Sequence, residues 1–252
     1  MSKLLLLVAL TATAFSLFTV QANNHKNRLT VVVYDYPPDI VNSATNPEGP
    51  FIEKLQSITN AADLQIDWLR TNMSMESTML DQGDRPFCTT GRAYSNERAK
   101  KWRFIPYLFS SLSTEFIIAR KENLSTLQKL GSIRALTANQ NFIGAFVKGG
   151  YYVDGTQKTL NMQQTWLQDI ALSEEHALRL VTAGRADYTI LPSATWKAMR
   201  SQSEQFSVLS SIHFAAKNES PVLLTCSKAL PEKIFLKLSG AMAKLGFEKF
   251  EP

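Results

Sequence analysis

Short apolar segments alternate with stretches of helical periodicity, and this order constrains the fold more than any other feature of the chain. A β-branched run at 29–34 predicts a strand, and 50–62 predicts a helix that begins with proline. A second strand at 64–69, a short helix at 75–80 and a third strand at 87–90 follow. The order β-α-β-α-β predicts a parallel sheet covered by helices.

A second α/β series begins after a polar break at 121–123, which follows a strand predicted at 114–120. Its predicted strands are 132–136, 186–190 and 206–209. Its predicted helices are 139–147, 165–170, 174–183 and 193–201. A last strand at 222–226 and a helix at 231–245 complete the chain. The two units are of similar size, so the polar break marks a candidate boundary between them.

The N-terminal segment has the features of a secretory signal peptide. Lys3 precedes an apolar run over 4–20, and small residues follow at the usual cleavage spacing before Ala22. The alternative is a membrane anchor, which the hydroxyl residues within the run disfavour. We therefore expect residues 1–22 to be removed and the mature protein to be soluble in the periplasm.

Charge and histidine content argue against two classes of function. The net charge is +5 before cleavage, and the Lys and Arg residues are spread out rather than gathered in a stripe, so nucleic-acid binding is not expected. The three histidines lie in unrelated segments without ligand-like spacing, so we expect no metal and no cofactor.

Several short motifs occur in an order that is typical of one protein family. They are Thr89-Thr90-Gly91, Ser95 to Arg98, Phe104 to Tyr107, Phe116 to Lys121, Leu180 to Ile190 and Leu224 to Lys233. In this order the chain resembles bacterial extracellular solute-binding proteins of family 3, which include periplasmic receptors for polar amino acids. The resemblance extends over the mature chain, although each motif alone is weak.

The resemblance implies an α/β fold of the type II-like periplasmic-binding-protein kind, with two α/β lobes joined by two crossover strands. Lobe 1 would consist of 23–118 and 221–252, and lobe 2 of 119–220. The ligand would occupy the cleft between the lobes, where the carboxyl ends of strands gather. We expect a monomer that hands a small-molecule solute to an inner-membrane transporter permease.

The resemblance assigns Arg98 to a ligand carboxylate, which a planar guanidinium binds in bidentate fashion. Residue types alone favour the alternative, a solvated helix arginine beside other basic residues, and the motif position reverses that preference. Thr89, Thr90 and Gly91 would form a turn that lets backbone N–H groups approach the ligand, or simply an ordinary strand exit. Arg92 departs from the family pattern, and either adds a second positive charge to the cleft or points to solvent.

Two further parts of the ligand site are expected away from this motif. Tyr36 lies where the family often places an aromatic that stacks on the ligand; alternatively it covers a stiff proline loop. In the second lobe, Asn139, Gln140 and Asn141 are predicted to precede a helix whose N-terminus favours an anionic or polar group, or merely to cap it.

One departure from the family bears on the ligand. Amino-acid receptors place an acidic residue soon after the strand that follows the glycine-containing helix end, to hold the ligand's ammonium. Here 190–193 contains no carboxylate, and Asp187 is interpreted as structural. The sequence therefore favours an organic acid, a modified amino acid or a peptide-like ligand over an ordinary amino acid.

Cys88 and Cys226 are the two cysteines of the chain, and an exported protein with an even number can pair them. In the fold that the resemblance implies, the return strand with Cys226 lies beside the strand with Cys88. We therefore predict a disulfide. The alternative is two buried thiols that pack as small apolar side chains.

The function predicted from this resemblance is solute capture for an ABC-type transporter, not catalysis. One alternative is an exported, dehydratase-like enzyme on the same scaffold, for which only Glu97 and Asp35 offer acid or base groups near the predicted site. Another alternative is a soluble ligand-binding partner of a membrane sensor.

Overall fold

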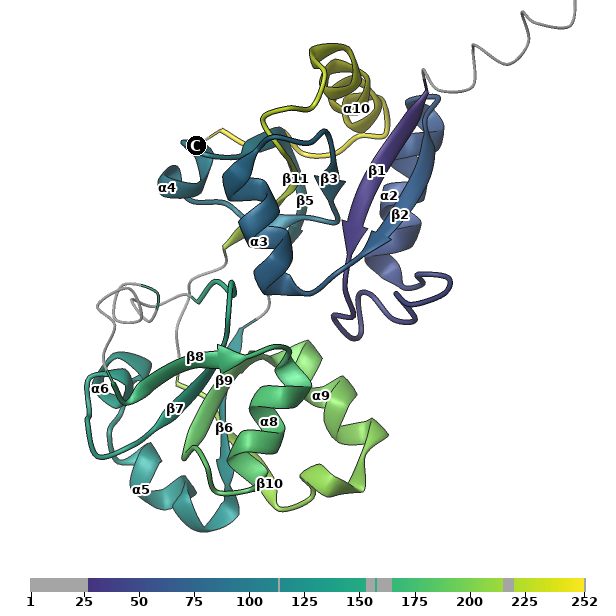
Figure 1. The fold of residues 1–252 in the computed structure, drawn as a ribbon. Helices are drawn as coiled ribbons and strands as arrows, with labels where there is room; N and C mark the ends of the chain where they lie inside the picture. The colour runs from purple at the N-terminus through teal and green to yellow at the C-terminus, as the bar shows by residue number, and fades with distance from the viewer. Residues whose placement is uncertain (1–26, 113, 153–156, 158–164, 215–219, 252) are drawn as a thin grey trace, which may run out of the picture.

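The computed structural model describes residues 27–112, 114–152, 157, 165–214 and 220–251, and these form two α/β lobes (Figure 1). The predicted signal peptide, residues 1–22, lies outside the described residues. No helix within the described ranges is both long and apolar enough to cross a membrane. The two-lobed α/β architecture is the one predicted from the sequence.

The first lobe is built on a mixed sheet with the order β2-β1-β3-β11-β4, and β5 also pairs with β11. The strands β1, β2 and β3 are parallel, whereas β11 runs antiparallel to β3, β4 and β5. Their bounds are β1 Arg28–Val33, β2 Gln65–Arg70, β3 Cys88–Thr89, β4 Arg92–Ala93, β5 Arg103–Ser111 and β11 Pro221–Cys226.

Helices cover both faces of this sheet, and the alternation of side chains along β1 shows how. Val31 and Val33 pack in one core cluster with residues of α2 (Pro50–Ala61) and α10 (Glu232–Lys244). Val32 points to the other face and packs with Leu80 of α3 (Met73–Gln82). The short α4 (Asn96–Ala99) follows β4.

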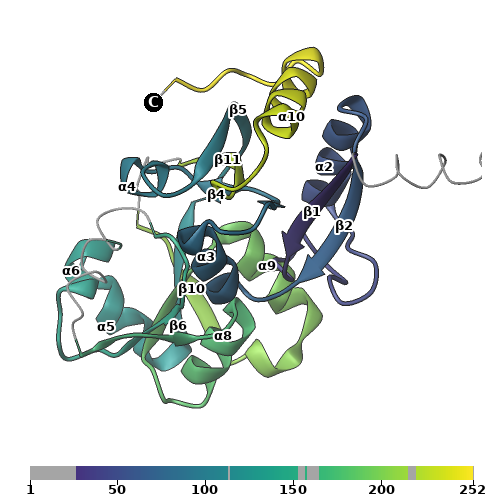
Figure 2. The same ribbon diagram turned by 45° about the horizontal axis from the view of Figure 1, so that its top comes forward.

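The second lobe has a five-stranded sheet with the order β10-β6-β9-β7-β8, in which β7 is parallel to β8 and β9. Its strands are β6 Glu115–Arg120, β7 Gly144–Val147, β8 Leu167–Ala171, β9 Tyr188–Pro192 and β10 Leu209–Ile212. One face packs against α8 (Glu174–Thr182) and α9 (Ser193–Gln202). The other packs against α5 (Leu124–Gln128) and α6 (Ile133–Thr137) (Figure 2).

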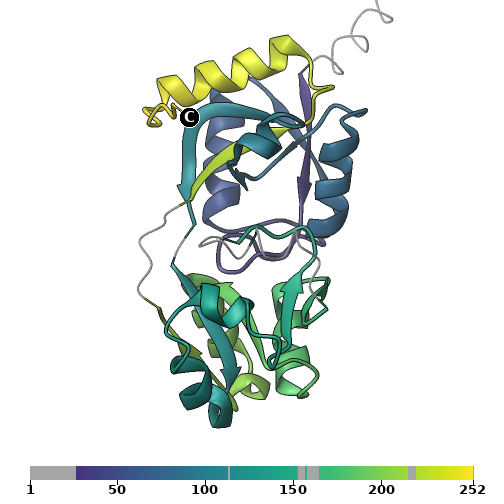
Figure 3. The same ribbon diagram turned by 90° about the vertical axis from the view of Figure 1, so that its left-hand side faces the viewer.

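The chain passes between the lobes twice, from β5 into β6 and from β10 back into β11 (Figure 3). The second lobe is therefore an insertion into the first. The lobe boundaries expected at 118/119 and 220/221 stay a prediction.

Several elements predicted in the second lobe are wrong. Segment 132–136, predicted as a strand, forms α6, because the Ser132 side chain accepts a hydrogen bond from the N–H of Ala135 and caps the helix. Segment 165–170, predicted as a helix, contributes to the strand β8 at the edge of the sheet. Phe206 belongs to a 3₁₀ turn, Glu204–Phe206, so the strand β10 begins later than predicted.

The helix predicted over 139–147 is also wrong, and this error bears directly on the site. Asn139 to Asn141 form a turn, and the chain then enters the strand β7. All four residues of β7 are buried, because helices cover both faces of the sheet. A strand buried on both faces shows no alternation of polar and apolar residues that could reveal it.

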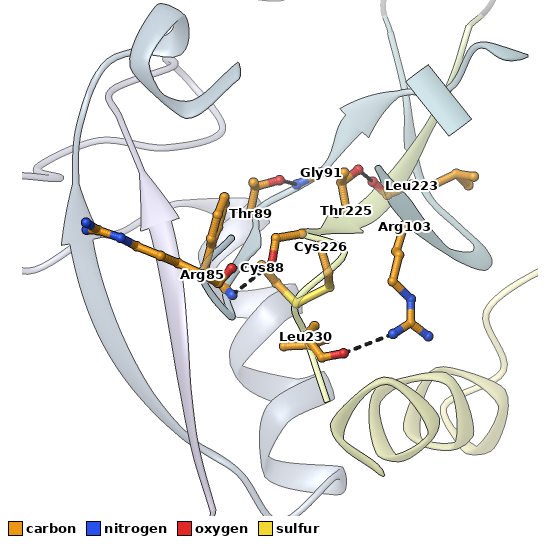
Figure 4. Close-up of a disulfide and its surroundings, with 11 residues drawn as sticks. Arg85, Cys88, Thr89, Gly91, Arg103, Leu223, Thr225, Cys226 and Leu230 are labelled. Carbon is orange, nitrogen blue, oxygen red and sulfur yellow. Dashed lines mark hydrogen bonds between the residues drawn. A yellow bond between two sulfur atoms is a disulfide. The ribbon is translucent and has the colours of Figure 1, made fainter. Parts of the chain in front are cut away.

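The predicted disulfide between Cys88 and Cys226 is confirmed (Figure 4). The two cysteines lie opposite each other in the β3–β11 ladder, with Cα atoms 3.9 Å apart. The neighbouring residues close the ladder, since the Ser227 N–H donates to the carbonyl of Phe87. Both cysteines are fully buried, and the bond pins β11 next to the turn that follows β3.

Candidate functional site

A cavity of about 250 Å³ lies between the lobes, and residues of both line it. From the first lobe come Tyr34 and Tyr36 after β1, and residues 90–93, which form the turn after β3 and the strand β4. From the second come residues 150–152 after β7 and Glu174 at the start of α8. The carboxyl ends of β1, β3 and β7 thus supply much of the lining, as expected for open α/β sheets.

Arg98 lines this cavity, held by contacts from both lobes. Its guanidinium carbon lies 4.7 Å from the ring centre of Trp102 and 4.8 Å from that of Tyr151, which belongs to the second lobe. Nη1 donates to the carbonyl of Ala93 at 3.1 Å. Burial and the charge of Arg92 lower the pKa of Arg98 to about 9, so the guanidinium stays positive at neutral pH.

Arg92 also lines the cavity, but it is buried, and both of its terminal nitrogens donate to protein groups, whereas its Nε has no hydrogen-bond partner within the described residues. Nη1 donates to the Tyr34 hydroxyl at 3.0 Å, and Nη2 donates to the carbonyl of Gly149 at 2.8 Å. The Glu76 carboxylate lies 4.0 Å from Nη1. The interpretation of Arg92 as a solvent-directed side chain is therefore wrong.

The turn after β3 brings Thr90 and Gly91 to the cavity wall. Gly91 has a φ of +123°, and a Cβ there would approach Val222 Cγ1 to 2.9 Å, so both backbone and packing require glycine. Thr89 is fully buried, and its hydroxyl accepts the N–H of Gly91 at 3.2 Å (Figure 4). Thr89 therefore shapes the turn, whereas Thr90 and Gly91 border the cavity.

The two tyrosines after β1 connect the lobes. Tyr34 and Tyr36 pack edge to face, with ring centres 6.4 Å apart, and both contact the core cluster of the second lobe. Burial raises the pKa of both hydroxyls. Tyr36 and Thr195, which lies at the start of α9, both line the cavity.

Asn139, Gln140 and Asn141 are not among the residues that line this cavity. The Asn139 side chain instead accepts the N–H of Asn141 at 3.0 Å. The second lobe contributes Gly150, Tyr151 and Tyr152, which the sequence analysis missed. The available signal was Gly149-Gly150, which follows the apolar segment 144–147 after one residue and is typical of a strand that ends at a ligand-binding turn.

Carboxylates line the cavity, but they come from outside the segment 190–193, where the family pattern places one. Glu174, Glu115 and Asp39 are among the lining residues. Burial raises the pKa of Glu174 from its ordinary 4.5 to about 7, which its own backbone N–H and Arg92 oppose. Burial also raises the pKa of Asp39, against the effect of Lys54. Segment 190–193 supplies no carboxylate, as the sequence shows, but three other residues of the cavity lining do.

Three other acids do not line the cavity. Asp187 accepts the N–H of Ile143 at 2.8 Å, which agrees with its predicted structural role. Asp35 accepts the N–H of Ser43 and lies 3.6 Å from Arg70, while Glu97 is exposed on α4. Neither of the acids considered for an enzyme lines the cavity. Within the described residues, no group of three or more His, Cys, Asp or Glu could hold a metal.

No protein-family model and no curated protein matches the sequence. Among solved structures, a histidine kinase sensor domain with similarity to periplasmic binding proteins matches with a TM-score of 0.68 and 16% identity, over 89% of this chain and 98% of that domain. An amino-acid ABC transporter substrate-binding protein from Streptococcus pneumoniae, bound to L-arginine, has a TM-score of 0.63 and 16% identity, over 90% and 92% of the chains.

A third solved structure is the putative binding component of an ABC transporter from Wolinella succinogenes, complexed with lysine. Its TM-score is 0.64 at 15% identity, over 88% of this chain and 92% of that one. At such identities the similarity establishes the fold. The chain has the two-lobed fold of periplasmic substrate-binding proteins.

Proposed function

We propose that this protein is a periplasmic solute-binding protein that closes its two lobes around a small, amino-acid-like solute with a carboxylate. The observation that carries the proposal is Arg98, a group that is positively charged at neutral pH in an interlobe cavity, with Trp102 of one lobe and Tyr151 of the other against its guanidinium. An arginine that stacks on aromatic rings still offers the edge of its guanidinium, which is the part that binds a carboxylate.

The same cavity contains groups suited to a positive charge, and these favour a zwitterion over a simple organic acid. Glu174 is almost fully buried, and burial raises its pKa. A cationic group on the ligand would compensate the buried carboxylate and lower that pKa again. The cavity volume of about 250 Å³ suits a solute of amino-acid size.

A role in transport is the leading form of this proposal, with an inner-membrane permease as the partner of a monomeric protein. Two of the similar structures belong to ABC transporters, which supports this form. A second form, ligand binding for a membrane sensor, is supported by the match to a histidine kinase sensor domain. Uptake of the identified solute by cells that lack the protein separates the two, since a sensor partner would leave uptake intact.

A thermal-denaturation screen tests the proposed site with pairs of solutes that differ by one group. Each amino acid is compared with the carboxylic acid that lacks its amine. We expect an amino acid at a hundredfold excess over its dissociation constant to add about 2.7 kcal/mol to the free energy of unfolding, and its partner to add much less. If no solute changes the unfolding temperature, the proposal is wrong; if only amine-free acids do, the zwitterion is wrong.

Glu174→Gln should change how stability depends on pH. The folded protein binds the Glu174 proton more tightly than the unfolded chain, because burial raises the pKa to about 7. The stabilising contribution of this group is therefore present below about pH 4.5 and lost as pH rises through 7. We expect the difference in unfolding free energy between variant and wild type to shift by about 3 kcal/mol in favour of the variant between pH 4.5 and 8.

Glu175→Gln is the matched control, because Glu175 lies in the same helical turn but is exposed and ion-paired with Arg179 at 3.0 Å. Urea denaturation at several pH values measures the effect. A pH profile for Glu174→Gln that runs parallel to that of the wild type would show that this carboxyl has no raised pKa.

A further inference from the structure

The loop after β7 in the second lobe docks on the N-terminal turn of α3 in the first. The carbonyl of Gly149 accepts a hydrogen bond from Arg92 Nη2 at 2.8 Å. The Ser77 hydroxyl donates to the same carbonyl at 3.4 Å, and it also lies 2.5 Å from Arg92 Nη2. One backbone oxygen of the second lobe is thus held by two side chains of the first.

The contact is close enough to exclude a side chain at residue 149. A Cβ at residue 149 would lie 2.9 Å from the carbonyl oxygen of Met73 and 3.1 Å from the Cα of Ser74. Gly149 also has a φ of +81°, in the left-handed region. Backbone atoms of the two lobes therefore touch at this point, and glycine is required in this arrangement on both grounds.

Apolar packing extends the same contact. Met73, the first residue of α3, is 7% exposed and packs in the core cluster of the second lobe, together with Val147 and Ala171. Lys148 N–H donates to the carbonyl of Ala171, which ties the loop to the strand β8. The start of α3 and the end of β7 thus form one continuous interlobe junction.

Within its own lobe, Arg92 faces the carboxylate of Glu76. Glu76, on α3, is 1% exposed, and its Oε2 lies 4.0 Å from Arg92 Nη1. Nη1 also donates to Tyr34, which contacts the second lobe. The groups within the first lobe would keep Arg92 in place with the lobes apart, whereas the bond to Gly149 exists only when they are together.

We infer that Arg92 is a positioning residue for lobe closure and does not itself hold the ligand. Its bond to Gly149 stabilises the closed arrangement. The same closure brings Tyr151 into contact with Arg98, the arginine that we propose to bind the carboxylate. The link to affinity rests on the proposed function, whereas the link to lobe closure does not. The equilibrium between open and closed lobes can be shifted only by an interaction that differs between the two states. The Arg92–Gly149 hydrogen bond is such an interaction, because it forms only in the closed state.

The distance between the lobes provides a direct test. Spin labels are placed on exposed positions of each lobe by Gln56→Cys in α2 and Gln128→Cys in α5, since the native cysteines are buried and bonded to each other. Distances between the labels are then measured in the wild type and in Arg92→Lys. Lysine keeps the charge beside Glu76 but lacks the planar fork that reaches Tyr34 and Gly149 together.

We expect Arg92→Lys to shift the distance distribution toward longer values and to weaken solute affinity about tenfold, while a saturating solute restores the short distance. The double variant Arg92→Met with Glu76→Gln removes the pair without leaving a buried charge. It should show the same shift toward longer distances, and it replaces the lysine variant in the test if that variant does not fold. The control is Arg103→Met with Glu232→Gln, an ion pair within the first lobe at 2.6 Å.

Each outcome decides the inference. Unchanged distances in both Arg92 variants overturn it, whatever their affinity. Lost affinity with an unchanged distance distribution would make Arg92 a ligand contact, which also overturns it. If no solute binds the wild type, the proposed function fails, but the distances without solute still decide whether Arg92 holds the lobes together.

Discussion

Arg98→Ala should weaken solute binding by roughly 1.5–3 kcal/mol, or about ten- to 150-fold, because it removes the charged donor in the cavity. The backbone around the residue should keep its conformation, since the Ser95 side chain caps α4 by accepting the N–H of residue 98 and does not depend on the guanidinium. Arg98→Lys should recover only part of the affinity, because an ammonium cannot form the two parallel hydrogen bonds of a guanidinium.

Isothermal titration calorimetry with the solute identified by the screen measures this effect. Arg103→Ala is the matched control, because Arg103 also stacks on an aromatic ring, with its guanidinium carbon 4.0 Å from the ring centre of Phe235. Arg103 is not among the residues that line the cavity, so its removal should leave affinity unchanged. Equal affinities for Arg98→Ala and the wild type would refute the assignment of the carboxylate to Arg98.

Replacing both cysteines, Cys88→Ala with Cys226→Ala, should lower the free energy of unfolding by about 2–5 kcal/mol. The bond joins residues 138 apart, so the closed loop contains every strand of the second lobe. Without this cross-link the unfolded chain has a higher conformational entropy, so the free energy of unfolding falls. Solute affinity of the folded variant should change little, because neither sulfur lines the cavity.

Urea denaturation of the oxidised wild type, the reduced wild type and the double variant separates the bond from the packing. The reduced wild type retains both sulfurs, so a loss of stability shared with the double variant belongs to the bond itself. Thiol titration of the denatured, unreduced protein gives an independent check. Two reactive thiols per chain would contradict the disulfide.

Most elements of the first lobe were predictable from the sequence because their signals are local and strong, although the strand β5 over Arg103–Ser111 was not among the predicted elements. The β-branched run of β1 and the proline at the start of α2 each define an element without reference to the rest of the chain. The second lobe was harder because its elements depend on their surroundings. β7 is buried on both faces and shows no alternation, and Ser132 begins a helix of only five residues.

The candidate site divides in the same way. Arg98, Thr90 and Gly91 lie in one short stretch, so a linear motif could predict them together. Glu174 and Tyr151 reach the cavity only through the pairing of strands in the second lobe and its position against the first. A helix predicted over 139–147 hides the strand end that precedes Tyr151, and no local motif marks Glu174 at the start of α8.

The position of β11 has a consequence for the order in which the lobes can be completed. This strand lies between β3 and β4, in the interior of the first lobe's sheet, yet it is the last strand of the chain. The five strands of the second lobe, by contrast, all lie between Glu115 and Ile212. During synthesis from the N-terminus, the chain therefore contains every strand of the second lobe before it contains β11, an inner strand of the first lobe. The first lobe therefore cannot complete its sheet until the C-terminal part of the chain is available. The contacts of β11 with β3 and β4 also span more of the sequence, so they carry the larger loop-closure cost.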